Sequence, residues 1–138
     1  MVRAHDLGVR GAENINYAIS SLSLDGVQLV VYKSIDGVAY SPNQLSSEQA
    51  RELSSKIKKN GKEIALVGAY FNPVHPNNDK IDNGIAVFED YLALANDLGC
   101  SYVGSETGSY NGDPWIYHPM NHSDEALERV VATFTRLA

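Results

Sequence analysis

The chain has 138 residues, a mass of 15.0 kDa and a formal net charge of −6. This length suits one domain with a core of its own, which we expect over residues 1–138. An acidic chain repels phosphate backbones, which argues against nucleic acid as a partner. The single cysteine, Cys100, excludes an internal disulfide and a cysteine-based zinc site.

The sequence shows no sign of a membrane segment or of secretion. No apolar stretch approaches the roughly 20 residues that span a bilayer. The N-terminus also does not have the pattern of a signal peptide. We therefore expect a cytoplasmic protein that has no membrane partner.

Strands and helices are predicted to alternate along the chain. A short, weakly apolar strand is expected over residues 2–7, and apolar residues at helical spacing predict a helix over 11–24. Residues 27–32 form a clear apolar strand. Ser46 and Gln49 then fit a capping box, in which each residue bonds the other's backbone, so a helix is expected to begin there.

The second half of the chain repeats this alternation. A strand is expected over residues 63–69, and its continuous apolar core suits burial on both faces. Asp82 or Asn83 opens the next helix, and a fourth strand covers residues 100–103. The apolar stripe of this helix is predicted to comprise Ile85, Phe88, Leu92, Ala95 and Leu98.

The last predicted helix follows a long loop over residues 105–122 that contains glycine, asparagine and proline. Ser123 is its expected N-cap, because a serine hydroxyl accepts from the backbone of the first turn. The positions expected to face inward are Leu127, Val130, Val131, Phe134 and Leu137.

The fold class that this pattern predicts is α/β with four βα units. Two architectures fit the alternation. One is half of a (β/α)₈ TIM barrel, which typically takes about 250 residues when complete. The other is an open, flavodoxin-like parallel sheet, which usually has a fifth strand. Both place ligands at the carboxyl ends of the strands.

The loop after the third predicted strand carries three polar side chains between two prolines. Tyr70, Asn72 and His75 supply a hydroxyl, an amide and an imidazole, while Pro73 and Pro76 stiffen the backbone. These groups suit a polyhydroxylated ligand held without a large loss of side-chain entropy. The alternative is a rigid loop in which the same side chains are satisfied structurally.

Glu106 is the candidate catalytic residue. It follows the fourth predicted strand, where a carboxylate is costly unless it is paired, hydrogen-bonded or bound to a metal. It could bind sugar hydroxyls, ligate a metal or act as a base with a raised pKa. Alternatively, it is locked to neighbouring backbone or to Lys33.

Four further side chains are candidates for substrate binding. His5 and Lys33 lie at the ends of the first two predicted strands, and Trp115 and His118 lie in the loop after the fourth. Imidazole titrates near neutrality, and an ammonium group can meet a phosphate or a carboxylate. Each of these residues also has an ordinary structural explanation. The histidines are scattered along the chain, so any metal site would need tertiary convergence, and we assign no metal ligand.

Three segments resemble the sugar phosphate isomerase/epimerase superfamily of xylose isomerase-like TIM barrels. They are Arg-Ala-His-Asp-Leu-Gly at 3–8, Tyr-Phe-Asn-Pro-Val-His-Pro at 70–76 and Gly-Ser-Glu-Thr-Gly-Ser at 104–109. The resemblance extends over nearly the whole chain and corresponds to the N-terminal half of the family's barrel. More distantly, the same positions resemble apurinic endonucleases, in which Glu106 would replace a metal-binding histidine.

The resemblance implies a sugar or a sugar phosphate as partner. Family members use a divalent metal, manganese or zinc, and move a proton with glutamates. Their usual metal ligands come from strands five to eight, so we do not expect this chain alone to bind the metal or to be active. The expected function is therefore a truncated isomerase or epimerase, completed as a homodimer through exposed strand edges. The alternatives are a non-catalytic small-molecule binding module and, less favoured by the acidic charge, a nuclease.

Overall fold

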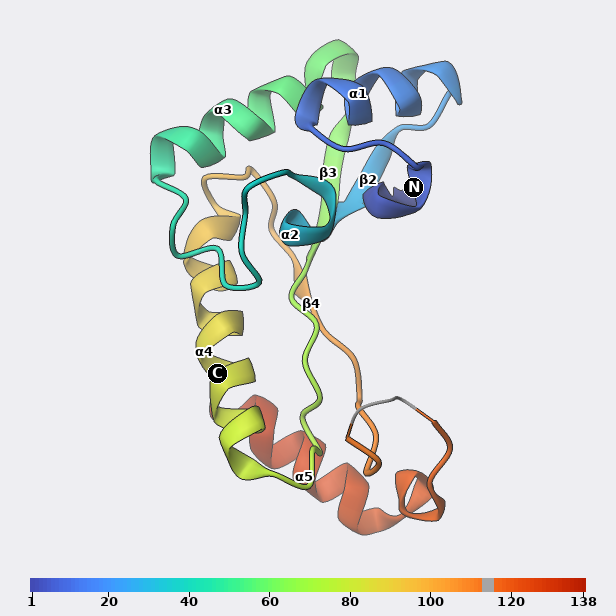
Figure 1. Ribbon diagram of the computed structural model, residues 1–138, viewed down its shortest axis with the longest axis vertical. Coiled ribbons are helices and arrows are strands. Elements are labelled where there is room, and N and C mark those ends of the chain that lie inside the picture. The colour runs from blue at the N-terminus through green and yellow to red at the C-terminus, as the bar shows by residue number, and fades with distance from the viewer. Residues whose placement is uncertain (113–115) are drawn as a thin grey trace. The chain divides into compact units, whose positions relative to one another are not determined.

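A computed structural model describes residues 1–112 and 116–138 (Figure 1). The candidate residue Trp115 lies outside the described residues. Contacts within the chain define two compact units. Unit 1 contains residues 1–69 and 90–104, and unit 2 contains residues 70–89 and 105–138.

Unit 1 is built on a parallel sheet in the strand order β1-β2-β3-β4. Its strands are β1 (Val2–Arg3), β2 (Gly26–Leu29), β3 (Glu63–Gly68) and β4 (Val103–Gly104). A flavodoxin-like sheet has the order 2-1-3-4-5, whereas strands of a (β/α)₈ barrel pair consecutively. The consecutive order and the open sheet confirm the predicted α/β class and agree with half of a barrel.

Two of the predicted strands are shorter than their apolar runs. The run over residues 2–7 pairs only as β1 and then turns into the 3₁₀ helix η1 (Ala4–Leu7). The run over 27–32 pairs as β2 and continues into the short helix α2 (Val31–Ser34). Val30 and Val31 are fully buried, so the sequence shows their burial correctly but not their conformation.

The fourth predicted strand also differs from the structure. Its pairing begins at Val103 rather than at residue 100, and β4 ends at Gly104. Cys100 is buried and has a free thiol.

Two helices cover unit 1, and Figure 1 shows them side by side: α1 (Ala12–Ser21) and α3 (Ser47–Ile57). The buried amide of Asn16 joins them, because its Nδ2 donates to the carbonyl oxygens of Ile57 and Lys59 at 2.8 Å each. The predicted capping box of α3 is confirmed by both of its hydrogen bonds. A 3₁₀ turn, η2 (Lys59–Gly61), follows α3 and leads to β3.

Helix α4 (Asn78–Ala95) begins before the predicted start at Asp82 or Asn83. The side chain of Asn77 accepts a hydrogen bond from the backbone N–H of Asp79 at 2.9 Å, which supplies a cap one turn earlier. Leu92 was expected on its buried stripe, but 44% of its surface is exposed.

Unit 2 has a small aromatic core. The rings of Phe71, Phe88 and Phe134 lie 6.0–6.1 Å apart, centroid to centroid, in tilted or edge-to-face pairs. Such arrangements are favourable for aromatic quadrupoles. The core therefore joins the loop after β3 to α4 and to the last helix, α5 (Asp124–Thr135).

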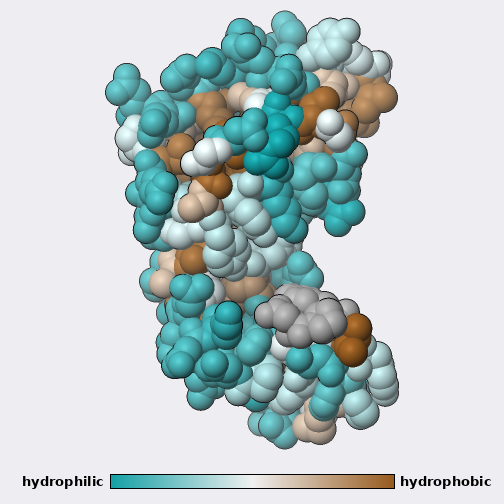
Figure 2. All heavy atoms as spheres, in the orientation of Figure 1, coloured by the Kyte–Doolittle hydropathy of each residue, from teal (hydrophilic) through white to brown (hydrophobic). Residues whose placement is uncertain are grey.

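Helix α5 begins as predicted, because the Ser123 hydroxyl accepts from the backbone N–H of Ala126 at 3.2 Å. It follows the 3₁₀ helix η3 (Pro119–His122). The prediction that Leu127 and Val131 face inward is wrong, since 64% and 56% of their surfaces are exposed. On the face drawn in Figure 2, apolar side chains form separate small groups within a mostly hydrophilic surface. No helix among the described residues is sufficiently long and apolar to cross a membrane.

Candidate functional site

The first group of candidate residues lies in unit 1, after β1 and β2. His5 sits in η1, and its side chain is only 18% exposed. Its Nε2 lies 3.7 Å from a carboxylate oxygen of Asp6, while its buried Nδ1 has no hydrogen-bond partner among the described residues. Burial lowers the pKa of His5. The Asp6 carboxylate opposes this effect, whereas Lys33 and Arg3 add to it.

Lys33 lies in α2, close enough to act electrostatically on His5. Its ammonium group is exposed and lies 5.7 Å from the centre of the Tyr32 ring. In the part of the chain that the structure describes, no carboxylate pairs with it. Two nearby arginines are instead occupied: Arg3 pairs with Asp6 at 2.6 Å, and Arg10 pairs with Asp36. Lys33 is thus a cation available for a ligand at this edge.

The second group lies in unit 2, where the loops after β3 and β4 are fastened together by Asn72. This amide is buried, and its Oδ1 accepts from the backbone N–H groups of Val74 at 3.2 Å and Ser109 at 3.0 Å. Its Nδ2 donates to the Ser109 carbonyl at 2.6 Å. These bonds give Asn72 a clear structural function, and its direct contact with a substrate stays a prediction.

Gly108 allows this close contact between the loops after β3 and β4. Its φ is +83°, and a Cβ at this position would lie 2.2 Å from the Asn72 Oδ1 and 2.8 Å from the Cδ of Pro73. A glycine lets the backbone come closer to a neighbouring group than a residue with a Cβ could. In the structure Gly108 lets the backbone approach the neighbouring loop.

His75 and His118 both stabilise turns in unit 2. The Nδ1 of His75 accepts from the N–H of Asn77 at 2.9 Å, and that of His118 accepts from Met120 at 3.2 Å. An accepting nitrogen carries no proton, so each neutral ring holds its proton on Nε2. His118 also stacks on Tyr110, with ring centres 5.8 Å apart. Tyr70, the first residue of this unit, is partly buried.

Glu106 is the least constrained of the candidate residues. It is exposed, and within residues 1–112 and 116–138 its carboxylate has no hydrogen-bond or ion-pair partner. Gly104, two residues before it, pairs with Gly68, which lies two residues before Tyr70. Glu106 and Tyr70 therefore each lie two residues after a member of the same strand pair, Gly104 and Gly68. No backbone group among these residues bonds the Glu106 carboxylate, while the alternative of a contact with Lys33, which lies in unit 1, stays a prediction.

The metal that the resemblance implies was tested against the side chains present. Among the described residues, no three His, Cys, Asp or Glu side chains come together in a group that could hold a metal ion. The described residues do not fit such an ion, and no chemical step of this chain is derived through a metal.

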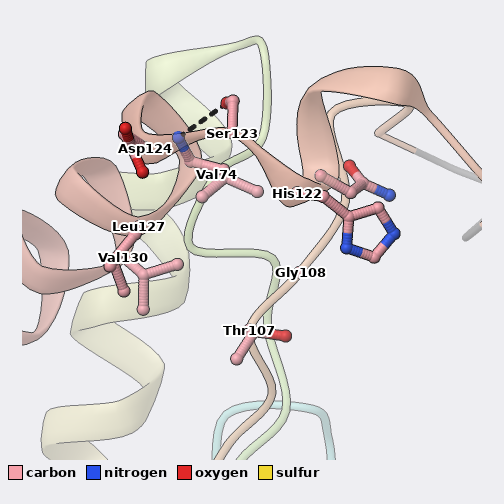
Figure 3. Close-up of a pocket in the computed structure, with 10 residues that line it drawn as sticks. Val74, Thr107, Gly108, His122, Ser123, Asp124, Leu127 and Val130 are labelled. Carbon is pink, nitrogen blue, oxygen red and sulfur yellow. Dashed lines mark hydrogen bonds between the residues drawn. The ribbon is translucent and has the colours of Figure 1, made fainter.

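Unit 2 also contains a cavity of about 310 Å³ that sequence reasoning missed (Figure 3). The loop at Thr107 and Gly108 borders one side, and the start of α5 borders the other. Thr107 belongs to the segment 104–109 that resembles the family, whereas Asp124 lies in the first turn of α5. The two segments meet because the Asn121 side chain bonds Ser109 and Tyr110, a tertiary contact with no local sequence signal.

The comparison with protein families agrees with the consecutive strand order. The profile of the family described as xylose isomerase-like TIM barrel matches residues 17–138. The chain belongs to this family, which confirms the resemblance found in its motifs. No curated protein and no solved structure matches the chain significantly.

Proposed function

We propose that this chain provides the substrate-binding half of a sugar or sugar phosphate isomerase or epimerase site, and that it does not isomerise sugars on its own. The observation that carries the proposal is the exposed carboxylate of Glu106, which follows β4 and has no partner among residues 1–112 and 116–138. Family membership supports it, because ligands of such barrels bind at this end of the strands. The xylose isomerase-like barrel fold of the chain does not depend on this proposal.

Each candidate residue, taken by itself, has chemistry that suits a task in such a site. Glu106 is the group that would move a proton at the carbon next to a sugar carbonyl. Lys33 would meet a ligand oxygen with its exposed ammonium group. His5, whose pKa is lowered mainly by burial, would be mostly neutral at pH 7 and able both to donate and to accept.

The proposal is tested by ligand-observed NMR on the full chain with matched aldoses, ketoses and their phosphates. We expect a subset to bind and no conversion of aldose to ketose. Lys33→Ala should weaken binding about threefold to tenfold, the size of one ordinary hydrogen bond at an exposed position. Lys59→Ala, in the turn η2 of the same unit, is the matched control and should leave binding unchanged. Conversion by the chain alone, or binding of none of these sugars, would contradict the proposal.

The second candidate function is a non-catalytic binding module. It is favoured by the lack of a metal-holding group among the described side chains. Glu106→Gln separates the two functions when deuterium exchange at the carbon next to the carbonyl is followed in D₂O with added Mn²⁺ or Zn²⁺. Exchange that Glu106→Gln abolishes favours the enzyme, and sugar binding without exchange favours the module.

We further propose that a second copy of the chain completes the barrel. A barrel of this kind has eight strands, and the sheet described here has four. No described strand pairs with the outer edge of β1 or of β4, and Tyr102 beside β4 is 69% exposed. Two copies related by a two-fold axis would pair β4 of each with β1 of the other. A cytoplasmic location remains a prediction.

A further inference from the structure

We propose that the cavity between residues 107–108 and the start of α5 binds a small organic cation, an ammonium group attached to a compact apolar body. The cavity measures about 310 Å³, at the lower end of the range for small-molecule sites. It shares no lining residue with the candidate sugar-binding set, so it goes beyond the function proposed above.

One part of the cavity wall is apolar and firmly held. Val74 is 2% exposed, and its backbone N–H bonds the buried Asn72 side chain at 3.2 Å. Leu127 and Val130 face the same space from α5, as Figure 3 shows. A Cβ at Gly108 would lie 3.1 Å from the Val74 side chain, so the two loops are in close contact. The apolar wall thus exists before any ligand arrives, which reduces the entropy lost on binding.

Polar groups that have no partner in the described part of the chain surround this wall. The Thr107 hydroxyl, the His122 imidazole and the Asp124 carboxylate make no hydrogen bond or ion pair with any described residue, although the His122 ring contacts Tyr117. Asn121, in contrast, is fixed by its bonds to Ser109 and Tyr110. The rim therefore presents free acceptors above an apolar surface, an arrangement typical of ligand sites.

The charges at the cavity favour a cation over an anion. No described lysine or arginine lines it, and Asp124 is an acceptor-only group. The N-terminus of α5 would attract an anion if its first-turn N–H groups had no cap and no acidic side chains beside them. Ser123 already caps it, and Asp124 and Glu125 already complement its dipole. An ammonium group beside Asp124, with its apolar body on Val74 and Leu127, satisfies both parts of the site.

The test compares three probes with the same ring and different charge: benzylamine, benzyl alcohol and benzoate. Each is titrated into the full chain, with backbone amide shifts followed by NMR. We expect benzylamine to bind about threefold more tightly than benzyl alcohol, and benzoate most weakly. The largest shifts should fall at Thr107, Gly108 and Leu127. Asp124→Asn should remove the preference for the amine over the alcohol.

Two further variants make the result specific. Asp79→Asn changes another exposed first-turn carboxylate in the same unit and should keep the preference. Leu127→Ala removes part of the apolar wall, so it should weaken both benzylamine and benzyl alcohol. The proposal is overturned if benzoate binds as tightly as benzylamine, if the shifts fall outside the cavity, or if no probe binds at about 10 mM.

Discussion

His5 shows how burial can prepare a titratable side chain in this protein. The residue sits at the end of β1 with its imidazole largely enclosed, and enclosure disfavours the charged ring. The nearby carboxylate of Asp6 offsets part of this effect, but Lys33 and Arg3 act in the same direction as burial. A ring that stays neutral can accept a hydrogen bond from a ligand hydroxyl, which an imidazolium cannot do.

The lowered pKa of His5 predicts a pH dependence of stability. The unfolded chain takes up a proton near the ordinary value of 6.5, and the folded chain does so only at lower pH. The unfolded state therefore binds more protons in that window, so the free energy of unfolding falls as the pH drops below 6.5.

His5→Gln should reduce this pH dependence, measured by urea unfolding at about pH 5 and about pH 7.5. The same variant assigns the His5 resonance in an NMR titration of the ring protons. A midpoint for His5 at or above 6.5 would contradict the burial seen here.

At the scale of elements, the loops after β3 and β4 act as one rigid piece because Asn72 joins them. Asn72→Ala would leave the N–H groups of Val74 and Ser109 and the Ser109 carbonyl without their buried partner. We expect a loss of about 3 kcal/mol in the free energy of unfolding, measured by chemical denaturation.

Asn83→Ala is the control for this variant, because Asn83 is exposed on α4 and should cost less than about 0.5 kcal/mol. If Asn72 served only to bind substrate, its replacement would leave stability as unchanged as the control does. A loss of sugar binding without a loss of stability would therefore reverse the interpretation of this residue.

The helices and strands show which features the sequence could predict. Local chemistry predicted the Ser46 and Ser123 caps, because a cap depends on residues within one turn. Apolar runs predicted the position of each strand but not its length. The buried run after β2 turns into a helix, since burial alone does not distinguish the two conformations.

The candidate site was predictable only in part for a related reason. Residue type and position after a strand pointed to Glu106 and Lys33, and both are exposed without an ion-pair partner among the described residues. The structural function of Asn72 depends on Ser109, which lies 37 residues away. Helical spacing likewise placed Leu127 inside, whereas α5 exposes it beside a cavity.

At the scale of the whole molecule, the open sheet is the feature that most needs an explanation. Exposed strand edges invite pairing with other chains, and the barrel family closes its sheet to remove them. The carbonyls of Tyr102 and Gly104 accept from the N–H groups of Val67 in β3 and of Ala69 just after it, so the backbone groups of Val103 face the outer edge. Val103→Pro would remove the outward N–H while leaving the bonds to β3, and it should prevent pairing with a second copy.

The most direct test of a half barrel completed by a second copy is the solution mass of the chain by light scattering. A dimer that closes the barrel has a mass near twice 15.0 kDa. The Val103→Pro variant should have the mass of a single chain, near 15.0 kDa. A well-folded unsubstituted chain with a mass near 15.0 kDa at all concentrations would contradict the dimer, because the edges of the sheet would then remain open in solution.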